Sequence, residues 1–220
     1  KAITGKTPDF IKIIKPVNSG VISDFDAQVA LTKKYLERSA HLYFSDQMIK
    51  PALTGFAVIP TTATEIEQKA LQEALYKSGV SQVFLIEKGL ATAAGCNLNI
   101  FSHQPNLIVD LGGGLIEIEI VGSGGIISQR TLKTAGENMN KLIFNYIFLK
   151  YGVILGEATC EELKVSLLNF FGEEKTVTIR GKSLETGLPK SVKIKSSDIK
   201  EALLSNFNQI VDAVKETIES

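Results

Sequence analysis

A strand that ends in an aspartate and turns through three glycines is the part of this sequence best suited to chemistry. The segment is Asp110-Leu-Gly-Gly-Gly114, and it follows the apolar run Leu107-Ile-Val. Successive backbone N–H groups without side chains can bind the oxygens of a phosphate, and the carboxylate of Asp110 can hold the water shell of Mg²⁺. Glycine is also the default residue of tight turns, so the segment alone also fits an ordinary hairpin.

A carboxylate and an amine, Glu161 and Lys164, form a second candidate pair. Their spacing of three places both groups on one face of a predicted helix. This spacing suits two groups that contact a ligand, and it also suits an ordinary exposed ion pair. His41 and His103 have no catalytic partner residues nearby in the sequence, so we expect both to be surface or loop residues. No arrangement of the Ser-His-Asp or Cys-His type is indicated.

The elements before the glycine turn predict a βαβ unit. A short apolar strand at 56–59 is followed by Thr62-Ala-Thr-Glu65, which has the spacing of a helix capping box. A helix with apolar residues on one face then runs to Gly79, and 82–86 indicates a second buried strand. The two strands of such a unit are expected to be parallel.

The elements from Pro105 onward predict a three-stranded antiparallel meander and then helices. The strand at 115–121 alternates isoleucines with Glu117 and Glu119. Aromatic residues around 144–148 and 170–171 are expected to pack in the core. The expected elements are strands at 107–111, 115–121 and 126–132, helices at about 138–150 and 159–169, strands near 176–180 and 192–195, and a long amphipathic helix from about 199 to 218. The second of these helices opens with another capping-box spacing, Thr159 to Glu162.

Composition indicates a folded protein without a large electrostatic field. The 220 residues include 24 Lys plus Arg and 24 Asp plus Glu, so attraction to nucleic acid is not supported. Cys96 and Cys160 stand alone, which indicates neither a disulfide framework nor a zinc site. The apolar runs are shorter than the roughly 18 residues that span a bilayer. A cytoplasmic location is therefore expected.

Five separated segments resemble, in order and in spacing, segments of the MreB group of bacterial actin relatives. The resemblance covers nearly the whole chain, and five segments in order are far more specific than any one of them. They are residues 16–25, 83–87, 110–114, 156–164 and 180–189.

The resemblance implies an α/β, actin-like (ribonuclease H-like) fold of two lobes that binds ATP or ADP with Mg²⁺, assembles into filaments and serves cell shape. The first lobe would span residues 1–106 and the second 107–220, with a helical subdomain at about 136–205. The matching positions would make the glycine turn the second phosphate hairpin, put Gly136 and Glu137 on the nucleotide side of the next turn, and place Glu161 and Lys164 near the ribose and base. The implied nucleotide-binding residues are Asp110, Gly112, Gly113, Gly114, Gly136, Glu137, Glu161 and Lys164, with Asp110 also holding Mg²⁺ through water.

Two positions depart from the pattern of this group. Its members usually carry two glutamates and a proline after the strand at 83–86, and a threonine after the three glycines, whereas this chain has Glu87-Lys88-Gly89 and Leu115. An ammonium group cannot accept a proton from water, and a leucine cannot hydrogen-bond to it. Glu87 could substitute, although strand alternation is expected to turn it to the other face. The sequence therefore predicts very slow hydrolysis or none.

Two further parts of an actin-type clamp are missing. Residues 1–15 hold no Asp-x-Gly turn, and no glycine follows Gly187, so we expect a fragment with weak nucleotide affinity. Self-association is expected, and membrane contact only through segments not in this chain. The alternative is a scaffold that no longer binds nucleotide and pairs with a complete actin-like partner. A sugar kinase or heat-shock ATPase is disfavoured, because neither a catalytic carboxylate nor a peptide-binding domain is visible.

Overall fold

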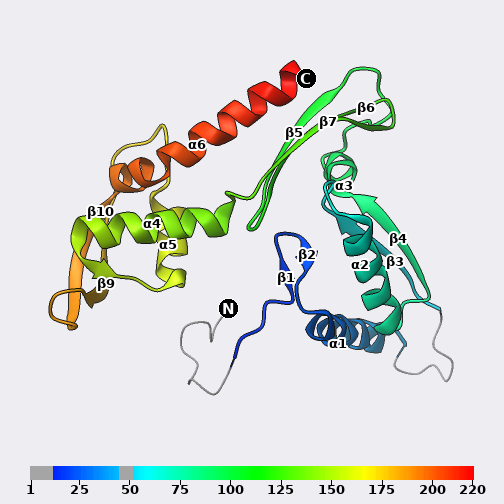
Figure 1. Cartoon of the computed structure of the whole chain (residues 1–220), viewed down its shortest axis with the longest axis horizontal. Coiled ribbons are helices and arrows are strands. Elements are labelled where there is room, and N and C mark those ends of the chain that lie inside the picture. Colours follow the sequence, from blue (N-terminus) through cyan, green and yellow to red (C-terminus); the bar gives the residue numbers. More distant parts are fainter. Residues whose placement is uncertain (1–11, 45–51) are drawn as a thin grey trace. The chain divides into compact units, whose positions relative to one another are not determined.

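The computed structural model describes residues 12–44 and 52–220, and their packing divides them into two compact units (Figure 1). Unit 1 contains residues 111–116 and 132–216, and unit 2 contains residues 13–110, 117–131 and 217–220. The strands that flank the glycine turn thus group mostly with unit 2 and the turn itself with unit 1. The predicted lobes, 1–106 and 107–220, stay a prediction.

Within the described residues, unit 2 combines three helices, a hairpin and a parallel strand pair with most of the three-stranded sheet. The strands β3 and β4 pair in parallel from Thr54 opposite Gln82 to Ile59 opposite Glu87, which confirms the predicted βαβ unit. Its elements are β1 (Val17–Asn18), β2 (Val21–Ile22), α1 (Phe25–Phe44), β3 (Thr54–Ile59), α2 (Glu65–Lys77), β4 (Gln82–Glu87), α3 (Lys88–Gly95), β5 (Asn106–Leu111), β6 (Ile116–Gly122) and β7 (Gly125–Leu132).

The capping box of α2 lies two residues later than the sequence spacing indicated. Thr64, not Thr62, is the N-cap residue, and it exchanges hydrogen bonds with Glu67. The N–H group of Ala63 donates to the carbonyl of Pro60, which places residues 60–63 in a turn. The prediction was wrong because this turn takes up Thr62, so that the helix can begin only after it.

The predicted meander is present, since the strand order of the sheet is β5-β6-β7. Consecutive neighbours are joined by the short segments 112–115 and 123–124, which are too short for a parallel crossover, so the pairing is antiparallel. Helix α3 packs on this sheet through Ala93, which contributes to one cluster with Ile108 of β5 and Val121 of β6. Because α3 begins at the residue after β4, this packing also fixes where its first side chain, Lys88, can reach.

Unit 1 is a helical unit with a small antiparallel sheet of order β10-β9-β8. The predicted capping box at Thr159 was wrong, because the N–H groups of Thr159 and Cys160 already donate to the carbonyl of Gly156 and α5 begins at Glu157. The core includes Ile143, Leu163, Ile194, Ile199 and Leu203, all fully buried. The elements are α4 (Gly136–Tyr151), β8 (Val153–Ile154), α5 (Glu157–Leu167), β9 (Thr176–Ser183), β10 (Pro189–Lys195) and α6 (Ser196–Glu219).

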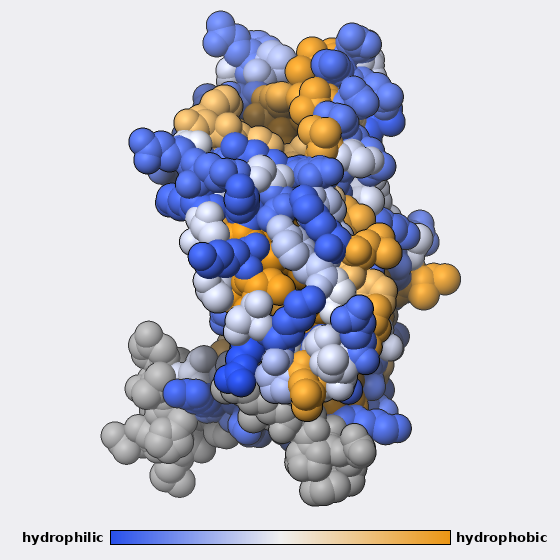
Figure 2. All heavy atoms as spheres, turned by 90° about the vertical axis from the view of Figure 1, so that its left-hand side faces the viewer, coloured by the Kyte–Doolittle hydropathy of each residue, from blue (hydrophilic) through white to orange (hydrophobic). Residues whose placement is uncertain are grey.

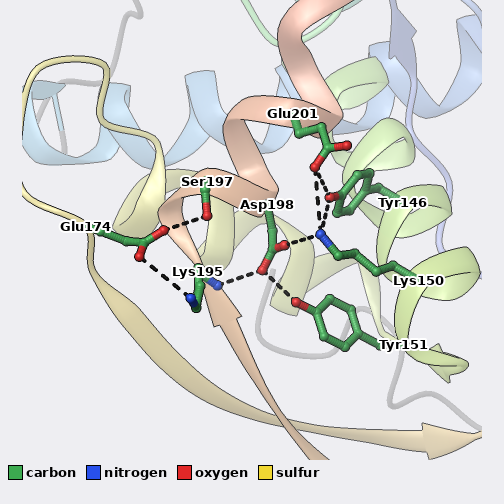
Figure 3. A network of polar contacts seen from close by, with 8 residues as sticks. All are labelled: Tyr146, Lys150, Tyr151, Glu174, Lys195, Ser197, Asp198 and Glu201. Carbon is green, nitrogen blue, oxygen red and sulfur yellow. Dashed lines mark hydrogen bonds and ion pairs between the residues drawn. The ribbon is translucent and has the colours of Figure 1, made fainter.

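A buried carboxylate, Asp198, joins three elements of unit 1 (Figure 3). It accepts hydrogen bonds from Lys150 Nζ at 2.8 Å, from the Tyr151 hydroxyl at 2.7 Å and from the backbone N–H of Lys195 at 2.8 Å. Burial alone would raise the pKa of Asp198, but these donors outweigh burial and lower it. The start of α6 is thereby tied to the end of α4 and to β10.

Apolar side chains do not form one continuous patch on the face shown in Figure 2. Hydrophobic residues, in orange, are divided there into several groups by hydrophilic ones. The prediction that the aromatic residues pack in the core was wrong for Phe171, which is fully exposed, and for Phe170, which is 48% exposed and contacts Phe207 edge to face. No helix in the described part of the chain is long and apolar enough to cross a membrane.

Candidate functional site

The glycine hairpin is closed by one backbone hydrogen bond and leaves two N–H groups unused. Gly112 N–H donates to the carbonyl of Leu115 at 2.9 Å, whereas no residue in the described ranges accepts a hydrogen bond from Gly113 or Gly114 N–H. None of the three glycines has positive φ, so the turn does not need glycine for its conformation. A Cβ on Gly113 would meet no atom within 4 Å. What glycine provides here is open access to two successive donors.

The start of α4 is bonded directly to this hairpin. Gly136 N–H donates to the carbonyl of Gly112 at 3.1 Å, and Glu137 N–H donates to that of Gly113 at 2.8 Å. A Cβ on Gly136 would lie 3.3 Å from Lys164 Nζ and 3.4 Å from the Gly112 carbonyl oxygen. Gly136 therefore permits a close approach of three segments, and its own N–H serves the hairpin instead of a ligand.

The pair Glu161 and Lys164 lies at the same place in unit 1. Lys164 Nζ is 2.8 Å from Glu161 Oε2 and donates to the carbonyl of Gly136 at 3.0 Å, with only 13% of its side chain exposed. The pair is therefore more than a solvated ion pair on a helix surface. Unit 1 thus brings the hairpin glycines together with the other predicted residues Gly136, Glu137 and Lys164.

Sequence reasoning missed Asn140, which completes this cluster. Its Nδ2 donates to Glu161 Oε2 at 2.7 Å, and the residue is only 7% exposed. Its Oδ1 is buried and accepts no hydrogen bond from the described residues. A buried polar atom without a partner is uncommon. The only signal in the sequence is its position one turn after Gly136.

Asp110, in unit 2, is paired with the first residue of α3. Lys88 Nζ lies 3.1 Å from Asp110 Oδ1 and 2.8 Å from Glu117 Oε2. Asp110 Oδ2 is 3.5 Å from the hydroxyl of Thr92, one turn further along the helix. Both oxygens of the carboxylate therefore face groups of α3.

Two glutamates of β6 lie beside this pair and are buried. The alternation with isoleucines is typical of a strand with one polar face, yet Glu117 and Glu119 are each 1% exposed. Thr61, after β3, donates its N–H to Glu117 Oε1 at 3.2 Å and its hydroxyl to Glu119 Oε1. Sequence reasoning did not assign these three residues to the site, because their approach depends on how β3 and α3 pack on β6.

The surroundings raise the pKa of both Lys88 and Glu119. Burial alone would lower the pKa of Lys88, but hydrogen bonds and attraction to Glu117 and Asp110 outweigh burial and raise it. Burial raises the pKa of Glu119, and the nearby Glu117 and Glu87 raise it further, against the hydrogen bond from Thr61. The ammonium group of Lys88 is therefore the fixed positive charge in an acidic surrounding.

This arrangement does not fit a carboxylate that is to hold Mg²⁺. An ammonium group already stands against Asp110, 3.1 Å from its Oδ1. Leu115, the other departure noted in the sequence, is buried and offers only its backbone carbonyl, to Gly112.

Comparisons with known proteins agree with the predicted family. The model of the family described as MreB/Mbl protein matches residues 1–220. The cell shape-determining protein Mbl of Bacillus subtilis is 33% identical over 221 residues, which cover 100% of this chain and 65% of that protein. The chain thus spans slightly less than two thirds of the length of this relative.

Solved structures of similar proteins share the fold. The crystal structure of MreB5 of Spiroplasma citri bound to ADP matches with a TM-score of 0.92 and 31% identity, covering 100% of this chain and 65% of that one. The same protein bound to AMPPNP gives a TM-score of 0.89 at 31% identity and the same coverage. The MamK double helical filament matches at 0.74 with 15% identity, over 93% of this chain and 61% of that one, which is a likeness of fold alone. The predicted actin-like α/β fold is confirmed.

Proposed function

The chain belongs to the MreB/Mbl protein family, and on that basis we propose that it is the nucleotide-binding part of a filament-forming bacterial actin homologue with a cytoplasmic role in cell shape. The proposal concerns the whole protein, of which this chain is the part that matches 65% of the relative from Bacillus subtilis. The ligand that we propose is ATP or ADP.

The observation that carries the proposal is the pair of unused N–H groups at Gly113 and Gly114. Two successive donors with no side chain in front of them suit a phosphate oxygen. The fold around them is the fold of MreB5, a protein solved with ADP and with AMPPNP. We assign these N–H groups to a phosphate of the nucleotide.

The neighbouring polar cluster of unit 1 supports a place for the ribose and base. Glu161 and Lys164 are held together and to the carbonyl of Gly136, so that their orientation is fixed before any ligand arrives. Asn140 Oδ1 offers a buried acceptor without a donor. We assign the hydroxyl or amino donors of the nucleoside to Glu161 and Asn140.

Slow hydrolysis, or none, is the second part of the proposal. Lys88 stands where the family usually has a glutamate, and its ammonium group, bound to Asp110 and Glu117, has no lone pair with which to accept a proton from water. Leu115 replaces the usual threonine and is buried. Purified protein with ATP is expected to release no phosphate above the background. Robust release that Asp110→Ala abolishes would refute this part.

Titration with a fluorescent ADP or ATP analogue tests binding, with two alanine variants as a matched pair. Gly113→Ala adds a methyl group to the hairpin that we assign to a phosphate, and Gly125→Ala adds one to the first residue of β7; neither new Cβ would meet an atom within 4 Å. Loss of a hydrogen bond to a charged group corresponds to about 1.5–3 kcal/mol, so Gly113→Ala is expected to weaken binding by about tenfold or more. Equal affinities for the two variants would contradict the assignment.

Sedimentation with and without nucleotide tests filament formation. A subunit that assembles around bound nucleotide is expected to pellet to different extents with ATP, with ADP and with neither. Sedimentation that is indifferent to nucleotide, or that needs an added complete actin-like protein, would favour the alternative, a scaffold that no longer binds nucleotide.

A further inference from the structure

The ammonium group of Lys88 lies against the carboxylate of Asp110. It lies 3.1 Å from Asp110 Oδ1 and 2.8 Å from Glu117 Oε2, and it therefore bridges two carboxylates from β5 and β6. Charge-assisted contacts of this length are strong ones. The ammonium group offsets one of the two negative charges and lies between the two carboxylates.

The fold holds Lys88 in this position through the residue that follows it. A Cβ on Gly89 would lie 1.9 Å from Glu119 Oε2, so the first turn of α3 approaches β6 as closely as only glycine allows. Movement of the Lys88 side chain away from Glu117 is unfavourable. Glu117 is 1% exposed, and its Oε2 has no donor in the described ranges other than the ammonium group of Lys88. Loss of that contact would leave a buried carboxylate uncompensated.

A divalent cation at Asp110 would have to compete with this built-in charge. Both would seek the same carboxylate, and the two positive charges would repel each other at short range. Mg²⁺ also gives up its water shell reluctantly and is usually held by one or two carboxylates together with phosphates. With the ammonium group of Lys88 already in contact with Oδ1, Asp110 has less to offer such an ion.

We propose that the ammonium group of Lys88 takes the place of Mg²⁺ at Asp110, so that this chain holds a nucleotide without a divalent cation. The exclusion of the metal ion from Asp110 depends only on the geometry of Lys88, Asp110 and Glu117. Binding of nucleotide without a divalent cation depends in addition on the proposed function. The two claims can therefore fail separately.

Binding of Mn²⁺ alone, followed by electron paramagnetic resonance, tests the exclusion without any nucleotide. At roughly millimolar Mn²⁺, a range in which weak carboxylate sites fill, the unmodified protein is expected to show no Mn²⁺ site that depends on Asp110. Lys88→Met keeps the length of the side chain and removes its charge, so it is expected to gain one Mn²⁺ site that the further change Asp110→Asn removes. A site in the unmodified protein that Asp110→Asn abolishes would overturn the proposal, and so would a folded Lys88→Met protein without any gain.

Nucleotide affinity in Mg²⁺ and in EDTA tests the consequence. The unmodified protein is expected to bind a fluorescent ADP analogue about equally in both buffers, within the tenfold that about 1.4 kcal/mol represents. A loss of that size in the unmodified protein would overturn the proposal without reference to any variant. Lys88→Arg, which keeps the charge, is the matched control and is expected to stay independent of Mg²⁺. Absence of binding in both buffers would refute the proposed function, and the Mn²⁺ measurement would still decide the exclusion.

Discussion

Replacement of Gly89 by alanine is expected to destabilise unit 2, whereas the same replacement at Gly95, on the same helix, is not. Both changes add a methyl group to α3 and share the gain in helix propensity, at most about 1 kcal/mol. They differ in surroundings, because the new Cβ at Gly89 would lie 1.9 Å from Glu119 Oε2 and 2.5 Å from its Cδ, whereas the one at Gly95 would meet nothing within 4 Å.

The expected magnitude follows from how little Glu119 can move. Its side chain is 1% exposed and is bonded to Thr61, so it cannot rotate into solvent. Overpacking of such a site typically costs about 1–3 kcal/mol. Because the propensity gain is largely common to both variants, this is also the expected difference in the free energy of unfolding between Gly89→Ala and Gly95→Ala.

Urea denaturation, monitored by circular dichroism, gives the difference in stability between the two variants from their midpoints. Hydrogen exchange shows where in the chain stability is lost, and the amides of α3 are expected to exchange faster in Gly89→Ala alone. Equal midpoints and equal exchange would refute the close approach of α3 to β6. A further change, Glu119→Ala, removes the clashing carboxylate, so the two changes together are expected to be less destabilising than their sum.

Three other changes have expected outcomes that thermal or urea unfolding can check. Glu119→Gln is expected to increase the free energy of unfolding at pH 7 but not at pH 4. Because the pKa of Glu119 in the folded state is raised, the unmodified protein loses stability as the pH rises above the ordinary value of 4.5. The glutamine amide does not titrate, so the variant has no such loss. Asp198→Asn weakens the charge-assisted hydrogen bond from Lys150, so the free energy of unfolding is expected to fall by roughly 2 kcal/mol at pH 7. Because the pKa of Asp198 in the folded state is lowered, the stability that its carboxylate contributes is present above the ordinary value of 3.8 and shrinks as the pH falls below it. Gly181→Ala would place a Cβ 2.3 Å from Val153 Cγ1 and is expected to lose about 1–3 kcal/mol; unchanged stability would contradict the packing of β8 on β9.

Features set by short-range pattern could be predicted from the sequence. The parallel strands β3 and β4 followed from two apolar runs on either side of an amphipathic helix, and α6 followed from apolar residues every three or four positions. The capping boxes were less certain because the spacing is degenerate. Thr64 to Glu67 satisfies it as well as Thr62 to Glu65 does, and only the turn before the helix decides between them.

Features set by packing between distant segments could not be predicted in this way. Lys88 could be recognised as unsuited to accept a proton, but its contact with Asp110 joins residues from two elements whose approach depends on Gly89. The burial of Glu117 is similarly hidden, because an isoleucine and glutamate alternation usually marks one solvated face. In unit 1 the resemblance indicated Lys164, whereas Asn140 could be found only from its unpaired oxygen.

The proposed slow hydrolysis and the proposed independence from Mg²⁺ depend on different properties of Lys88, and one variant can separate them. Slow hydrolysis follows from what the ammonium group lacks, a lone pair for a proton of water, whereas independence from Mg²⁺ follows from what it has, a positive charge beside Asp110. Methionine at this position also has no group that accepts a proton, and Leu115 stays buried and apolar. Lys88→Met is therefore expected to become dependent on Mg²⁺ for nucleotide binding without releasing phosphate. If it released phosphate, the charge of Lys88 would be what blocks hydrolysis, and the loss of the two water-handling groups would not.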